Sequence, residues 1–220
     1  MAGSRLANLS AAVFFLVAAA GCTTMDLLRS DPGGGGRAES RAIPLEERLP
    51  VAPLPRFRAG DSFVYRFPNG SQQEEMVTAA RGERVEWSLA SGARWTTVTG
   101  IMFNTSDWGG TAGYGSGQQR FGSMSGSLFP MRVGNVLHYT AHGESTRSSD
   151  RWTQRWSCTV PAEERIRVIA GTFDTYRVIC YRAGQLRTYY YAPELGIYVL
   201  RITTGRDAGR KELVSYRRAP

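Results

Sequence analysis

The side chains best suited to acid–base or metal chemistry are two histidines, His138 and His142, in a segment with strand-like alternation. On a strand these two share a face, because side chains an even number of residues apart point the same way. Glu144 and Asp150 are nearby, so a metal site can be drawn, but a zinc site requires three or four ligands at suitable spacing. Two solvated histidines are the better interpretation, and we predict no metal and no cofactor.

The serines do not indicate nucleophilic catalysis. The stretch Gly122 to Gly126 reads Gly-Ser-Met-Ser-Gly, which is shifted by one residue from a G-x-S-x-G nucleophile elbow, and no helix pattern follows it. A pair of carboxylates for glycoside hydrolysis remains an open alternative, because the distance between two carboxylates depends on the fold and not on their spacing in the sequence. No catalytic residue can be named, so we predict that the chain is not an enzyme.

The first of three cysteines, Cys22, follows a mostly apolar run from Leu6 to Ala20. This run is too short to cross a bilayer, which needs about 20 residues, and is typical of a signal peptide. The stretch Ala19-Ala20-Gly21-Cys22 resembles the bacterial lipobox, although Ala19 stands where Leu is usual. The resemblance implies cleavage before Cys22, lipidation of Cys22 and, since Thr23 rather than Asp follows, anchoring on the periplasmic side of the outer membrane. The alternative is an ordinary secretory signal with a free Cys22.

The other two cysteines, Cys158 and Cys180, then remain as an even pair in an oxidising compartment. Both fall on apolar faces of expected strands, so we predict a disulfide between them. Redox catalysis is the alternative, but it lacks the C-x-x-C spacing.

The charge of the chain is basic, with 27 Lys and Arg against 19 Asp and Glu and a formal net charge of +8. The cations are nearly all arginines interspersed with acids, and no basic block appears, so we predict a solvated charged surface and no nucleic-acid partner. Gly33 to Gly36 and four prolines between 44 and 55 indicate a flexible linker. We therefore divide the chain into a signal peptide (1–21), a lipid-anchored linker (22–55) and one domain (56–220).

The domain shows the period of β-strands. Phe63, Tyr65 and Phe67 alternate with other residues before Asn69-Gly70, a strong hairpin signal, and Val85, Trp87 and Leu89 alternate likewise. We predict a mainly β fold with few helices, a curved antiparallel sheet or half-barrel built from two meander-like halves. A long Gly/Ser-rich loop is expected at about 104–128. Three aromatic side chains are candidates to face a ligand: Trp108 and Tyr114 in that loop, and Tyr190 within a run of three tyrosines.

Two segments of the domain, Val168 to Tyr181 and Arg187 to Ile202, look like a theme of a large group of uncharacterised exported bacterial proteins. In that group a strand, an AGTF-type turn and a second strand precede a Y-Y-A-P-x-x-G hairpin, and the opening Phe129 to Gly134 also matches. The resemblance implies a curved antiparallel sheet and no catalytic residues. Broadly similar architecture occurs in envelope lipoprotein carriers, whose half-barrel holds acyl chains.

These observations predict a non-catalytic envelope lipoprotein, a structural or binding module attached to the membrane through its lipid anchor. Its partner would be an envelope protein, a glycan or a lipid. The alternative is a carrier of a lipid or other apolar ligand in the concave face of the sheet, and a hydrolase is the third class. A large cavity lined by Trp and Phe would favour the carrier, whereas a filled core with an exposed aromatic patch would favour the binding module.

Overall fold

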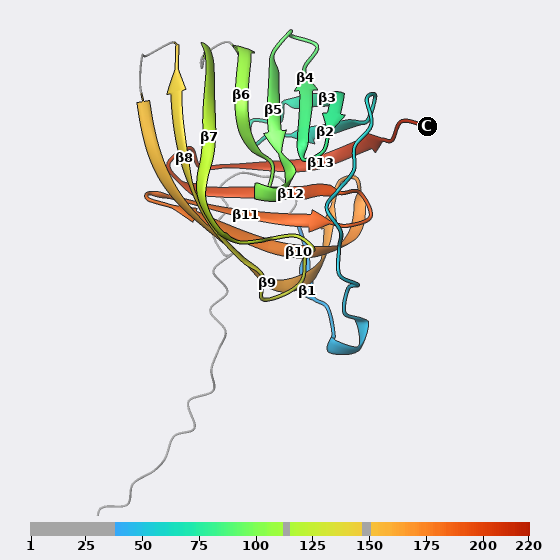
Figure 1. The fold of residues 1–220 in the computed structure, drawn as a ribbon. Helices are drawn as coiled ribbons and strands as arrows, with labels where there is room; N and C mark the ends of the chain where they lie inside the picture. The colour runs from blue at the N-terminus through green and yellow to red at the C-terminus, as the bar shows by residue number, and fades with distance from the viewer. Residues whose placement is uncertain (1–37, 112–114, 147–150) are drawn as a thin grey trace, which may run out of the picture. The chain divides into compact units, whose positions relative to one another are not determined.

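The computed structural model describes residues 38–111, 115–146 and 151–220, all within the unit that runs from Gly35 to Pro220. Thirteen strands and two short 3-10 helices make up this part of the chain (Figure 1). The elements in chain order are β1 (Ser40–Ala42), η1 (Leu45–Glu47), β2 (Ser62–Arg66), β3 (Gln72–Arg81), β4 (Arg84–Ser88), β5 (Arg94–Val98), η2 (Thr99–Ile101), β6 (Asn104–Thr111), β7 (Gly115–Gly126), β8 (Val136–Ser145), β9 (Arg151–Val168), β10 (Gly171–Arg182), β11 (Gln185–Ala192), β12 (Ile197–Gly205) and β13 (Gly209–Arg217). The mainly β, antiparallel prediction is confirmed.

The sheet is a single up-and-down meander that closes on itself. From β2 to β13 every strand pairs antiparallel with the next, and β13 returns to pair with β2 through Leu213 opposite Tyr65. The half-barrel prediction is therefore wrong, because twelve strands form a closed barrel and β1 adds a thirteenth strand on β9. Closure removes the free edges that an open sheet exposes.

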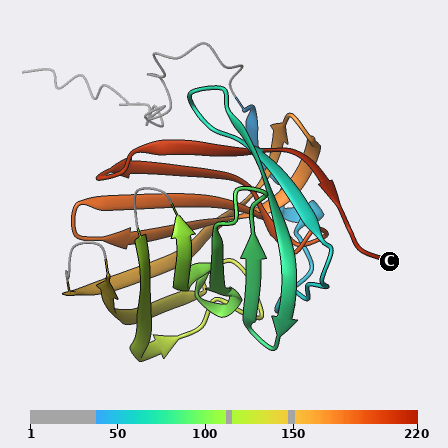
Figure 2. The same cartoon turned by 90° about the horizontal axis from the view of Figure 1, so that it is seen from above.

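The strands of the barrel run in two main directions. In Figure 1, β4 to β8 stand upright while β10 to β12 run across them, and Figure 2 shows the same crossing from above. The long strand β9 joins the two sets, since Arg151 to Thr159 pair with β8 and Ser157 to Val168 pair with β10. One strand thus belongs to both walls of the barrel.

The predicted loop at about 104–128 is also wrong, since most of it forms β6 and β7. Gly117 in this segment and Gly143 on the next strand, β8, allow the close approach of tryptophan rings. A Cβ at Gly117 would lie 2.2 Å from Cζ2 of Trp108 on the neighbouring strand, and a Cβ at Gly143 would lie 2.2 Å from the ring of Trp152. Glycine at these positions makes room for an aromatic ring. Composition alone cannot distinguish a glycine with this role from a glycine in a flexible loop.

The expected linker is ordered in its described part, residues 38–55. β1 pairs with β9, Ala52 is buried and bridges Met131, and the Tyr176 hydroxyl donates to the carbonyl of Pro50 at 2.9 Å. This half of the linker therefore packs against the barrel. Residues 1–21, the predicted signal peptide, and residues 22–37 lie outside the described residues.

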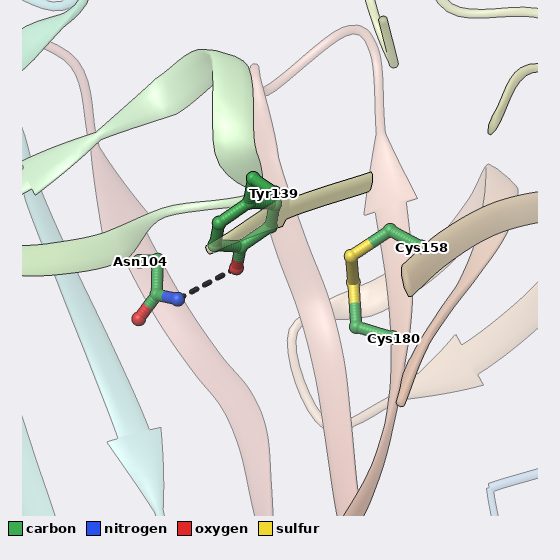
Figure 3. Close-up of a disulfide and its surroundings, with 4 residues drawn as sticks. All are labelled: Asn104, Tyr139, Cys158 and Cys180. Atoms are coloured by element: carbon green, nitrogen blue, oxygen red, sulfur yellow. Dashed lines mark hydrogen bonds between the residues drawn. A yellow bond between two sulfur atoms is a disulfide. The ribbon is translucent and has the colours of Figure 1, made fainter. Parts of the chain in front are cut away.

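The predicted disulfide joins Cys158 on β9 to Cys180 on β10 (Figure 3). The two residues are direct cross-strand partners, 22 residues apart in sequence, and both are buried. In the chain-entropy model a crosslink of this loop length stabilises the fold by about 3 kcal/mol.

Part of the barrel interior is filled by aromatic rings packed edge to face. The ring centroid of Phe57 lies 6.2 Å from that of Phe63, 5.4 Å from that of Trp87 and 5.9 Å from that of Phe103. Such pairs add about 0.5–1.5 kcal/mol each to the burial of their area. No helix in the described part of the chain has the length and apolar character needed to span a bilayer.

Candidate functional site

The rest of the interior forms a cavity of about 820 Å³ that is open to solvent. Its lining comes from strands all around the barrel, and includes all five tryptophans of the chain. Nine aromatic side chains line it, namely Phe67, Trp87, Trp95, Phe103, Trp108, Trp152, Trp156, Tyr189 and Tyr198. Trp87 and Phe103 also belong to the ring cluster around Phe57, so that cluster bounds the cavity.

Two pairs of tryptophans form flat portions of the cavity wall. Trp87 and Trp95 face each other across β4 and β5, with ring centroids 6.3 Å apart and planes 8° apart, and Trp87 Nε1 donates to Thr97 Oγ1 at 2.9 Å. Trp108 and Trp152 stack at 6.0 Å over the two glycines described above. The Trp108 Nε1 atom is buried without a hydrogen-bond acceptor among the described residues. The wall thus offers aromatic faces and one unused N–H group.

A buried ion pair lies against the cavity on β3 and β13. Lys211, the only lysine of the chain, donates to Glu75 at 2.5 Å and to the Tyr198 hydroxyl at 2.9 Å. Its ammonium also sits 4.1 Å from the centroid of the Tyr65 ring. The charge of Lys211 is therefore matched within the protein.

Arg201 on β12 lines the cavity close to this ion pair. Burial by itself lowers the pKa of Arg201, but the electrostatic influence of Tyr198, Tyr189 and Glu75 outweighs it and raises the pKa. Its guanidinium carbon lies 5.9 Å from the Tyr198 ring centroid. Arg201 is thus a charged wall residue.

Two further arginines each lie within cation–π distance of the same tryptophan ring. The guanidinium carbons of Arg182 on β10 and Arg187 on β11 lie 5.4 and 5.0 Å from the centroid of Trp156, whose ring stacks parallel to Tyr139 at 6.1 Å. Burial, and then the positive charge of Arg187, lower the pKa of Arg182. Its acidic neighbour is Asp207, at 3.8 Å and two-thirds exposed. The structure therefore holds two like charges side by side.

Side-chain amides complete this part of the wall. Asn104 Nδ2 donates to the Tyr139 hydroxyl at 2.7 Å (Figure 3), and Gln119 Nε2 donates to Asn104 Oδ1 at 3.3 Å. Burial raises the pKa of Tyr139, against the effect of the Asn104 hydrogen bond. Tyr139 is thus a neutral phenol that supports the amides lining the cavity.

The structure brings one of the predicted ligand-facing aromatics to the cavity. Trp108 lines it, whereas Tyr190 is buried away from it and its neighbour Tyr189 takes that place. Tyr114 and Cys22 lie outside the described residues. His138 and His142 are both exposed on β8, and the described residues contain no group of three or more metal-ligating side chains.

Sequence reasoning missed the four cations of the cavity, Arg182, Arg187, Arg201 and Lys211. A signal was present at two of them. Arg182 continues the buried alternation of Tyr176, Val178 and Cys180, and Arg187 precedes Tyr189 with the same period. A charged residue that falls on the inward-facing positions of a strand, in alternation with apolar residues, indicates that the interior is partly polar.

The fold and its interior define a closed antiparallel barrel with a ligand-sized cavity. No protein-family model matches the chain, and no curated protein matches it in sequence. Among solved structures it is similar to the hypothetical lipoprotein YmcC from Escherichia coli, with a TM-score of 0.47, 9% identity and coverage of 73% of this chain and 85% of that chain. It is also similar to a Bacteroides fragilis protein named as exported with a YmcC-like fold, with a TM-score of 0.42, 12% identity and coverage of 76% and 100%.

Proposed function

We propose that this chain is a non-catalytic binding protein of the bacterial cell envelope, anchored at the outer membrane through lipidated Cys22, that holds its ligand inside the barrel. The observation that carries this proposal is the concentration of all five tryptophans around a cavity of about 820 Å³. A cavity of this size, mostly preformed and lined by aromatics with a few polar groups, is typical of small-molecule sites. His138 and His142 are exposed and do not line this cavity.

A second candidate function, carriage of a lipid or other apolar ligand, is favoured by the extent of the aromatic surface. Burial of apolar area in such a cavity contributes about 25 cal/mol per Å². The lining contains only three aliphatic side chains, Leu89, Ala93 and Ile197, and this small number argues against an acyl chain as the ligand. We therefore place the binding module first and the acyl carrier second.

Native mass spectrometry of the full mature protein, extracted from envelopes in mild detergent, tests the proposal. We expect a retained mass in the natural protein and a smaller retained fraction in Trp95→Ala, because Trp95 supplies a flat face of the cavity. Tyr181→Ala is the matched control, since Tyr181 is an exposed aromatic outside the cavity. An empty protein whose tryptophan emission is also unchanged by added envelope extract would contradict the proposal.

A further inference from the structure

The polar part of the cavity lining indicates the class of ligand. Besides nine aromatic and three aliphatic side chains, the lining contains seven uncharged polar side chains and five charged ones. An acyl chain would cover these groups without hydrogen-bonding to them, and each uncompensated polar group costs free energy on burial. A sugar ring matches the lining better, because its C–H face lies flat on an aromatic ring while its hydroxyls bond to amides.

The charges of the lining are unbalanced. Four cations face one carboxylate, Glu75, which is already bonded to Lys211 at 2.5 Å. Among the described residues neither Arg187 nor Arg201 has a carboxylate within salt-bridge distance, and Arg182 has the mostly exposed Asp207 at 3.8 Å. Positive charge in a partly desolvated wall favours an anionic ligand.

The two arginines over Trp156 are arranged to receive that anion. The guanidinium carbons of Arg182 and Arg187 lie 5.4 and 5.0 Å from the centroid of the Trp156 ring. Arg182 Nε donates to Gln185 Oε1 at 3.0 Å, so the terminal nitrogens of Arg182 are the ones that face the choice between Asp207 and a ligand. A guanidinium binds a carboxylate or a phosphate through two parallel N–H···O bonds, and the negative charge relieves the repulsion between Arg182 and Arg187.

We propose that the ligand is an acidic carbohydrate, whose sugar rings lie on the tryptophans of the wall and whose carboxylate or phosphate is bound by Arg182 and Arg187 against Trp156. This inference rests on the proposed function, because it specifies the ligand of the same cavity. Asn104 and Gln119 supply amides to the sugar hydroxyls, and Arg187, which has no internal carboxylate partner among the described residues, is the main determinant of charge selectivity.

Tryptophan emission of the full mature protein in detergent provides the assay, since every tryptophan of the chain lines the cavity. The probes are tetragalacturonic acid, its fully methyl-esterified form, a phosphorylated mannose oligomer and palmitate. We expect saturable changes with the acidic sugars and binding of the neutral ester that is weaker by about tenfold or more, which corresponds to the loss of a charge-assisted hydrogen bond. The acid that binds more tightly, carboxylate or phosphate, identifies the acidic group.

Arg187→Gln should weaken binding of the acidic sugar by a similar factor and leave binding of the ester unchanged. Arg155→Gln is the matched control, because Arg155 is exposed on β9 next to Trp156 and does not line the cavity. Equal binding of acid and ester, or equal effects of the two substitutions, would overturn the anion site. Binding of palmitate without binding of either acidic sugar would overturn the carbohydrate assignment and leave the proposed function in place. A response to no probe and to no envelope extract would overturn both.

Discussion

The substitution Gly143→Ala tests whether glycine in the barrel wall makes room for tryptophan. The added Cβ would lie 2.2 Å from Cε2 and Cζ2 of Trp152 and 2.5 Å from its Nε1, whereas ordinary contacts begin near 3.4 Å. The ring must therefore withdraw by roughly 1.2 Å, the difference between 2.2 and 3.4 Å, and its stacking partner Trp108 limits that movement. Overpacking of this kind costs about 1–3 kcal/mol, while replacing glycine by alanine in a strand returns about 0.5–1 kcal/mol. We expect a net loss of up to about 2.5 kcal/mol in the free energy of unfolding.

Gly122→Ala is the control for this experiment. Gly122 lies on β7, has no positive φ, and a Cβ there would meet nothing within 4 Å, so we expect no loss of stability. Urea denaturation followed by far-ultraviolet circular dichroism measures both free energies, and near-ultraviolet circular dichroism reports the displacement of the tryptophan. Equal stability of the two variants, with an unchanged tryptophan spectrum in Gly143→Ala, would refute the argument.

Three further predictions concern the buried charge, the disulfide and the anchor. Lys211→Met should lower the free energy of unfolding, measured by urea denaturation, by about 3–5 kcal/mol, because it leaves Glu75 as a buried unpaired charge. Adding Glu75→Gln to this variant should recover part of the loss. A Lys211→Met variant as stable as the natural protein would contradict this prediction. Replacing Cys158 and Cys180 by alanine should lower the free energy of unfolding by about 3 kcal/mol, measured in the same way, and the natural protein under reducing conditions should match the double variant. Cys22→Ala should move the protein from the membrane to the soluble fraction of cells, and membrane retention of that variant would show that the lipobox interpretation is wrong.

Local signals in the sequence predicted the strands and their turns. Asn69-Gly70 joins β2 to β3, with Gly70 at a φ of 80°, and the amide of Phe67 bonds to the carbonyl of Ser71 at 2.9 Å. Gly82 and Gly92 likewise connect β3 to β4 and β4 to β5. The disulfide was also predictable, because two cysteines remained once one was assigned to the lipid.

Closure of the barrel was not predictable, because it depends on a contact between distant parts of the chain. β13 pairs with β2, and Arg66 reaches Glu212 at 3.3 Å across 146 residues of sequence. The pattern of each strand is the same in an open sheet and in a closed one, since both bury one face. The cavity depends on closure, so sequence patterns could place its aromatics on one face without showing that they surround a space.

The Gly/Ser-rich segment and the cavity have one physical explanation. A side chain at Gly117 would collide with Trp108 and one at Gly143 with Trp152, so in both cases the tryptophan would have to leave its place against the wall. Glycine opposite tryptophan lets a large ring lie flat on the sheet, and flat rings leave the space in front of them open. Gly117, within the segment whose composition predicted a loop, and Gly143, on the following strand β8, therefore both give an ordered tryptophan room against the wall. Gly143→Ala should accordingly weaken binding of an acidic sugar as well as lower stability, whereas Gly122→Ala should change neither.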